Sequence, residues 1–310
     1  MIGGAFKSMN QFRAPVKRRL LHGFLKIAGE QIHIIRGDRL SLIGAIIFSA
    51  FVFMAIFAPL LAPYDPMEIL RKDNGEAAYL EPPSGRHLLG TTNMGRDVLS
   101  QVIIGTRKAL LMGVLAALSI TFIGANMALF AGYYKGKVDE VLMRIVDISF
   151  SIPLIPFVIV LVAILGASDL NIILAISLFL WRSPARVIRA QTLSLSERPF
   201  VKAAKVAGAS DFRIMYLHIA PNLIPMCFLY AAFGLGWAVT AESSVSFLGF
   251  GDPQFISLGG ILHTAFLSGA FRKAWWWAAA PGICLTLLIL SAFLISHGYE
   301  VVVNPRLKEN

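Results

Sequence analysis

Long apolar windows without a single charged residue dominate the sequence. Each of five such windows is longer than the roughly 20 residues that a helix needs to cross a bilayer. A sixth apolar stretch, residues 170–181, is shorter and ends at Arg182. This pattern predicts an all-α, polytopic membrane helix bundle with about six transmembrane helices. The five long windows are residues 40–64, 109–134, 148–168, 214–241 and 274–299.

The distribution of basic residues predicts the orientation of these helices. With six crossings and the N-terminus inside, the predicted cytoplasmic segments hold 20 of the 28 Lys and Arg residues. Lys and Arg are enriched in the cytoplasmic loops of membrane proteins. If residues 170–181 did not cross the membrane, the seven basic residues of 182–213 would lie outside. We therefore predict that the short stretch crosses as a tilted or broken span, and that both termini are cytoplasmic.

These spans divide the chain into five parts. A basic cytoplasmic tail at residues 1–39 precedes the first transmembrane helix at 40–64, and a polar external loop follows at 65–108. A five-helix core occupies residues 109–299, and a second cytoplasmic tail occupies 300–310.

The composition supports a membrane protein and excludes several functions. The chain is 56% hydrophobic and only 15% charged, whereas about 25% of residues are charged in a typical soluble domain. The cytoplasmic excess of basic residues explains the net charge of +10, so no nucleic-acid partner is expected. Cys227 and Cys284 lie in apolar windows and lack metal-ligand spacing. The sequence also lacks a phosphate-binding loop of the form GxxxxGK[ST].

The most informative stretch is the predicted cytoplasmic loop at residues 189–222. Ser194 and Glu197 have the spacing of a capping box, and proline is favoured in a first helical turn, as at Pro199. We expect a short helix that Gly208 terminates, followed by a second helix that Ser210 caps.

One face of this short helix has the shape of a docking surface. Phe200, Ala203, Ala204 and Ala207 share that face by their i, i+3, i+4, i+7 spacing. A single large apolar side chain beside three alanines suits a groove on another protein. The alternative is a helix that packs against its own bundle.

The same stretch resembles the EAA loop of bacterial ABC-importer permeases. The motif is carried by Lys202-Ala203-Ala204, Gly208 and Ile219-Ala220-Pro221, although the family usually has Glu in place of Lys202 and Leu in place of Ala220. Further stretches resemble the C-type permeases of the dipeptide/oligopeptide/nickel branch. These are SLIGAIIFSAFVFMAIFAPLLAPYDP at 41–66, HLLGTTNMGRDVLSQVIIG at 87–105 and ESSVSFLGFG at 242–251. The usual GDxLRDxLDPR ending is poorly kept.

This resemblance implies a type I ABC importer permease in a bacterial inner membrane. It implies a non-catalytic subunit for di- or oligopeptides or a related small solute. The expected partners are a second homologous permease, two ATPase subunits, an external solute-binding protein and the lipid bilayer. ATP and Mg²⁺ would bind to the ATPase subunits, and no cofactor or metal is expected in this chain. The ATPase-coupling residues would be Phe200, Lys202, Ala203, Ala204, Ala207, Gly208 and Pro221.

Two further groups are candidate functional residues. Gly95-Arg96-Asp97 lies in the external loop, where Asp97 is placed to cap a helix and Arg96 to pair with an acidic neighbour. The triplet is either a docking surface for a binding protein or a structural turn. Glu242 lies near the outer end of the fifth span and is a candidate for the substrate path, because an acidic residue at membrane depth is often functional.

A self-contained secondary transporter or channel is the alternative function. Such proteins place ionisable residues at mid-membrane and often contain inverted repeats. The sequence shows no convincing repeat, and its spans contain almost no charge in their middle.

Overall fold

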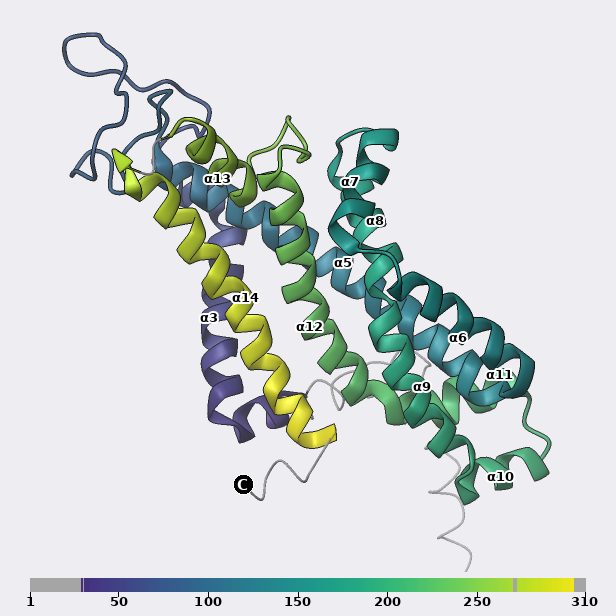
Figure 1. Ribbon diagram of the computed structural model, residues 1–310. Coiled ribbons are helices and arrows are strands. Elements are labelled where there is room, and N and C mark those ends of the chain that lie inside the picture. Colours follow the sequence, from purple (N-terminus) through teal and green to yellow (C-terminus); the bar gives the residue numbers. More distant parts are fainter. Residues whose placement is uncertain (1–28, 30, 270–271, 304–310) are drawn as a thin grey trace, which may run out of the picture.

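The computed structural model describes residues 29, 31–269 and 272–303, and within them it is an elongated bundle of helices without a β-sheet (Figure 1). Most of the expected tail at 1–39 and the end of the tail at 300–310 lie outside the described residues. The helices are α3 (Arg39–Ile56), α4 (Ala58–Leu61), α5 (Val98–Tyr134), α6 (Gly136–Phe150), α7 (Leu154–Leu165), α8 (Asp169–Leu180), α9 (Arg182–Ser196), α10 (Pro199–Val206), α11 (Asp211–Arg213), the π-helix η2 (Ile214–Ile219), α12 (Ala220–Phe247), α13 (Leu258–Leu267) and α14 (Trp275–Val303).

Five helical stretches of the described chain are long and apolar enough to cross a membrane, and the number is six if a bent helix pair is counted as one span. The number predicted from the sequence is therefore confirmed. The end of the bundle that carries residues 62–97 is called the outer end below, and the end that carries α10 the inner end (Figure 1). The straight stretches are Arg39–Ile56, Val98–Tyr134, Asp169–Ser196, Asp211–Phe247 and Trp275–Val303.

The third span differs from the straight helix expected at 148–168. The chain bends by 90° between α6 and α7. Pro153 lies at the break as the N-cap of α7, and a proline disfavours helical backbone in the residue before it. The 12 residues of α7 extend about 18 Å, less than the roughly 30 Å of a hydrocarbon core. The crossing therefore needs the bent pair.

The fourth span is longer than its apolar window, because the basic residues that follow continue the helix. α8 and α9 together form a 28-residue stretch. Arg182 stacks on the rings of Phe150 and Phe179, at 4.6 and 4.5 Å from the ring centroids. Further along α9, Arg186 pairs with Asp147. These contacts tie α9 to α6 and accommodate the positive charges.

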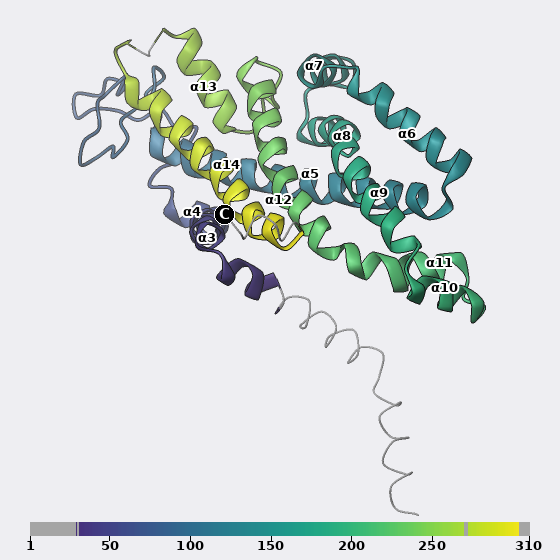
Figure 2. The ribbon, with the colours of Figure 1, turned by 60° about the horizontal axis from the view of Figure 1, so that its bottom comes forward.

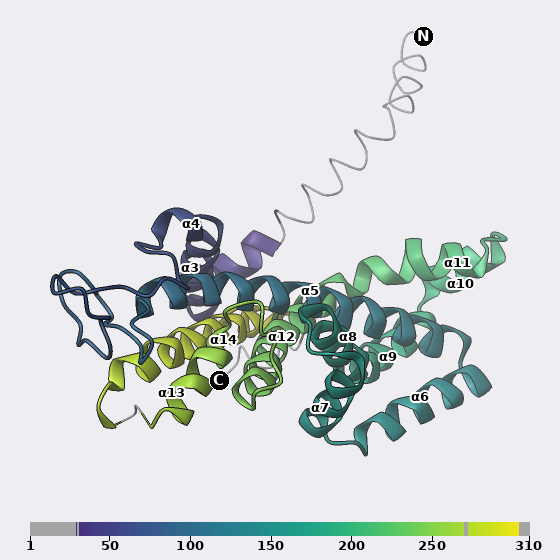
Figure 3. The ribbon, with the colours of Figure 1, turned by 90° about the horizontal axis from the view of Figure 1, so that it is seen from above.

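The longest single helix organises the bundle. α5 extends along the length of the molecule (Figure 3) and packs against α3, α8, α9, α12 and α14. Gly124 and Gly132 allow α9 to approach, because a Cβ on Gly132 would lie 2.6 Å from the Cβ of Thr192. A Cβ on Gly124 would lie 2.7 Å from Cγ of Pro184. These two glycines in the second span therefore serve close helix packing.

Two groups of helices lie on opposite sides of α12. α3 and α14 pack side by side on one side, while α6, α7 and α8 lie on the other (Figure 2). α13 packs against α5, α12 and α14 at the outer end. Its 10 residues extend only about 15 Å, so it is too short to cross a membrane.

Candidate functional site

The inner end carries the predicted docking helix on a tight connection between two long helices. The expected capping box is wrong, because α9 continues to Ser196 and places Ser194 inside the helix. Glu197 is instead the C-cap of α9, and α10 begins at Pro199 without a side-chain cap. Proline suits this first position because its missing N–H has no helical partner there.

The end of α10 follows the prediction closely. Gly208 has φ +80°. Its N–H donates to the carbonyl of Lys205 at 3.1 Å, and the N–H of Ala209 donates to the carbonyl of Ala204 at 3.1 Å. This pair of bonds is a Schellman motif, which satisfies carbonyls that the helix leaves without a donor. The chain then turns to Ser210, whose hydroxyl caps α11 by accepting from the N–H of Arg213 at 3.4 Å.

Packing on the bundle determines which face of α10 is free. Val201 is buried and Ala204 is half-buried against the cluster that includes Ile214. Ala204 therefore belongs to the inner face, in contrast to the expectation that it shares the docking face. Phe200 is 41% exposed and Val206 is 91% exposed.

The free face of α10 thus combines apolar and small side chains. It consists of Phe200, Ala203, Val206 and Ala207, and this set is called the α10 face below. The sequence pattern missed Val206 because its spacing from Phe200 departs from the i, i+3, i+4, i+7 series. An isolated valine at 91% exposure has no packing role in this chain. The contact of the α10 face with a partner stays a prediction.

Ionic and hydrogen-bonded contacts hold the loop against the inner end of α5. Glu197 pairs with Lys135, just after α5, and with Lys202 on α10 at 3.2 Å. The hydrogen bond from Lys135, and then that from Lys202, lower the pKa of Glu197. Tyr133 donates to the carboxylate of Asp211 at 2.6 Å. Lys202, which replaces the usual glutamate of the motif, is therefore bound to its own chain.

The second helix of the loop contains a π-helical turn that the sequence reading did not predict. Residues Ile214–Ile219 form η2, which continues directly into α12. Pro221 lies in the first turn of α12, and Pro225 lies inside that helix. A proline removes one backbone donor and crowds the preceding turn, and such helices relax into wider turns. These two prolines are the sequence feature from which the π-helical turn could have been predicted.

At the outer end, the Gly95-Arg96-Asp97 triplet forms a turn that starts α5. Gly95 has φ +72°, and a Cβ there would lie 3.3 Å from the carbonyl oxygen of Leu70. Asp97 is buried and caps α5 by accepting from the N–H and the hydroxyl of Ser100, both at 2.8 Å. The predicted cap is confirmed. The expected ion pair of Arg96 is wrong, since no carboxylate of the described chain pairs with it.

We expect Asp97→Ala to lower the thermal unfolding midpoint of the detergent-solubilised protein. Loss of a helix N-cap costs about 1–2 kcal/mol, and burial of Asp97 places this site at the upper end. Asp97→Asn is the matched control, because its amide oxygen still accepts from Ser100. If Asp97→Ala unfolds normally and loses only contact with an external protein, the triplet is a docking surface rather than a turn.

The third candidate, Glu242, is almost completely buried, with 1% of its surface exposed. It accepts from Ser246 at 2.8 Å and from Ser243 at 3.3 Å, both on its own helix. Nearby, Lys108 of α5 pairs with Asp169 at the start of α8 at 2.8 Å. The three charges lie where α5, α8 and α12 meet. Glu242 is buried at this junction, and its role in a substrate path stays a prediction.

Metal chemistry has no support in the described chain. No group of three or more His, Cys, Asp or Glu side chains there is placed to hold an ion.

Comparison with known proteins gives consistent matches along the chain. Residues 124–309 match the family described as the binding-protein-dependent transport system inner membrane component. Residues 30–83 match the N-terminal transmembrane domain of oligopeptide transport permease C.

Individual relatives cover almost all of the chain. The dipeptide transport system permease protein DppC of Haemophilus influenzae is 33% identical and covers 88% of this chain and 92% of its own length. The glutathione transport system permease protein GsiD of Pectobacterium atrosepticum is 32% identical and covers 83% of this chain and 84% of its own length. The oligopeptide transport system permease protein OppC of Bacillus subtilis is 30% identical and covers 88% of this chain and 88% of its own length.

Proposed function

Since the chain belongs to the family of inner-membrane components of binding-protein-dependent transport systems, of the dipeptide/oligopeptide permease branch, we propose how it works within an ABC importer. It forms the translocation path together with a second, homologous permease. Two separate ATPase subunits bind ATP and Mg²⁺, and an external binding protein delivers the solute. Both termini lie in the cytoplasm of a bacterial cell.

The shape of the inner end carries this proposal. The α10 face is exposed, while the opposite side of α10 is fixed by Val201 and by the ion pairs of Glu197. After the turn at residues 207–210, α11 leads without a break through η2 into α12, which reaches the outer end. A movement imposed on α10 by an ATPase is therefore passed to a transmembrane helix. This is a mechanical coupling of two sites through one rigid element.

The proposed solutes are di- or oligopeptides or related small compounds. The named relatives carry dipeptides, glutathione and oligopeptides. These solutes share peptide bonds and at least one carboxylate, which supports the solute class. They differ in size, and the external binding protein would select among them.

Reconstitution in proteoliposomes tests the function. We expect the chain alone to hydrolyse no ATP and to take up no labelled tripeptide. Addition of the second permease, the ATPase subunits and the binding protein encoded beside it should give ATP-dependent uptake. The control replaces the ATPase by a variant that binds ATP without hydrolysing it, which should stop uptake. Accumulation by the chain alone, driven by an ion gradient, would instead establish a secondary transporter.

A further inference from the structure

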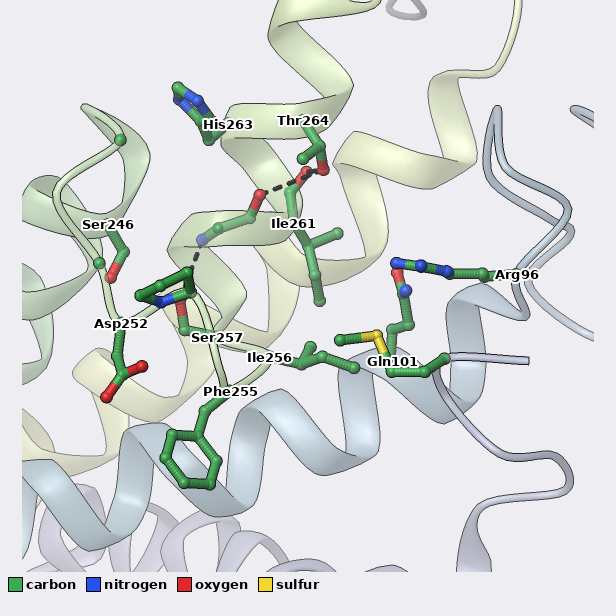
Figure 4. A pocket seen from close by; sticks show the side chains of 15 residues that line it. Arg96, Gln101, Ser246, Asp252, Phe255, Ile256, Ser257, Ile261, His263 and Thr264 are labelled. Atoms are coloured by element: carbon green, nitrogen blue, oxygen red, sulfur yellow. Dashed lines mark hydrogen bonds between the residues drawn. The ribbon is translucent and has the colours of Figure 1, made fainter. Parts of the chain in front are cut away.

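A polar pocket of about 330 Å³ lies at the outer end of the bundle. It is formed by the turn before α5, the start of α5, the segment between α12 and α13, and α13 itself (Figure 4). Pockets of about 300–1,000 Å³ accommodate small molecules. Met67, Ile256 and Ile261 contribute apolar wall, and the charged side chains of the lining are Arg96 and Asp252. The pocket therefore combines a small-molecule volume with both apolar and polar groups.

Arg96 and Asp252 both lack an ion-pair partner in the described chain, and Arg96 also has an unsatisfied donor. Its Nε is buried and has no hydrogen-bond acceptor, and it belongs to no ion pair of the described chain. A buried, unmade hydrogen bond to a charged group is costly. Figure 4 shows Arg96 and Gln101 on one side of the pocket and Asp252 on the other.

The other polar groups of the lining are already engaged. The carboxylate of Asp252 accepts from the N–H of Gln254 at 2.9 Å and from that of Asp169 at 3.2 Å. Nδ1 of His263 donates to the carbonyl of Phe247, 2.7 Å away. Ser257 accepts from the N–H of Gly260 at 3.0 Å. Arg96 is therefore the charged residue of the lining with a donor that lacks an acceptor.

Hydrogen bonds hold the backbone of Arg96 in the turn before α5. The N–H of Arg96 donates to the hydroxyl of Thr92 at 3.2 Å, and its carbonyl accepts from the N–H of Thr92 at 2.9 Å. Gly95 on one side has little free space, and Asp97 on the other is a buried helix cap. Preorganised donors lose little freedom when a ligand binds. The site is thus built into the turn that starts α5.

We propose that this pocket is a loading site for the carboxylate of the transported solute, with Arg96 as the residue that binds it. The guanidinium fork matches a carboxylate in two parallel hydrogen bonds. The pocket lies at the outer end of the bundle, where an imported solute would arrive. This inference rests on the proposed function. A free C-terminal carboxylate is present on every unmodified linear peptide, so the site takes peptides irrespective of their sequence.

Chemical footprinting of the importer complex in lipid nanodiscs, without the binding protein, tests this site. Phenylglyoxal modifies accessible arginines, and mass spectrometry reads the modified fraction of Arg96. We expect trialanine to protect Arg96 at roughly one tenth of the concentration that trialanine amide needs, because a charge-assisted bidentate contact is worth at least tenfold in affinity. Arg86, exposed in the outer loop and paired with Asp73, is the internal control and should show no protection.

Three outcomes would overturn the proposal. Equal protection by both peptides means that the carboxylate is not what binds. In a second arm with solute-free binding protein added and no peptide, protection of Arg96 means that this residue belongs to a protein contact. A lack of any modification of Arg96 means that the pocket is closed. Retention of the ATPase subunits in the same complex reports on the proposed function, so the two failures are distinguishable.

Discussion

Gly208→Val is expected to abolish ATP-driven uptake and to release the ATPase subunits, while the chain still inserts in the membrane. Gly208 has φ +80° and ends α10. A β-branched residue in left-handed backbone costs more than the roughly 1–2 kcal/mol of an ordinary side chain. The strain is relieved by unwinding the Schellman motif, which displaces the α10 face. Uptake in proteoliposomes and co-purification of the ATPase in detergent measure both effects.

Gly208→Asn provides the control for this substitution. Asparagine tolerates left-handed backbone, and the position has no atom within 4 Å of a new Cβ. We therefore expect the asparagine variant to support near-normal uptake. If the valine variant transports normally with its ATPase bound, this helix end does not couple the subunits.

The second large effect is expected at the most exposed apolar residue of the α10 face. Val206→Glu should weaken ATPase binding about tenfold or more, because it places a charge in the proposed contact, and the few hot-spot residues of an interface contribute about 2 kcal/mol or more each. The same change should leave the thermal unfolding midpoint of the isolated chain nearly unchanged, because Val206 is 91% exposed. Affinity is measured with labelled ATPase and nanodisc-embedded permease.

A matched variant separates a docking effect from a general effect of negative charge. Val302 is also exposed and lies at the end of α14, so Val302→Glu changes the same residue type outside α10. It should bind the ATPase with normal affinity. Equal losses in the two variants would remove the α10 face from the interface.

Lys202→Ala should have a mild effect on ATPase binding, because the pair of Lys202 with Glu197 is exposed and exposed ion pairs contribute little.

The sequence predicted the features that depend on local chemistry. A charge-free window must be covered by lipid or protein, so the number of crossings followed from these windows together with the distribution of basic residues. The caps at Asp97 and Ser210 and the stop at Gly208 were also predictable, because each requires only a short side chain or a positive φ at a helix end.

The features that the sequence did not predict depend on tertiary contacts. The fourth span continues past Arg182 because aromatic rings from two helices accept its guanidinium, and no local pattern contains that information. Ala204 lies on the inner face of α10 because Val201 is drawn into the cluster beneath it. The pocket at Arg96 joins segments that are about 150 residues apart in the chain, so only the folded protein brings it together.

The unbroken run from Asp211 to Phe247 is also a lever. Its 37 residues correspond to a rod about 55 Å long. A tilt of about 5° around the inner end would displace the far tip by about 5 Å over that length. The wide turn at Ile214–Ile219 is where this rod departs from α-helical hydrogen bonding, and such π-helical turns are rare and often lie at functional sites. The stiffness of the turn at Ile214–Ile219 therefore determines how far a displacement at the inner end moves the outer end of the helix. A softer turn would bend and transmit less of that displacement.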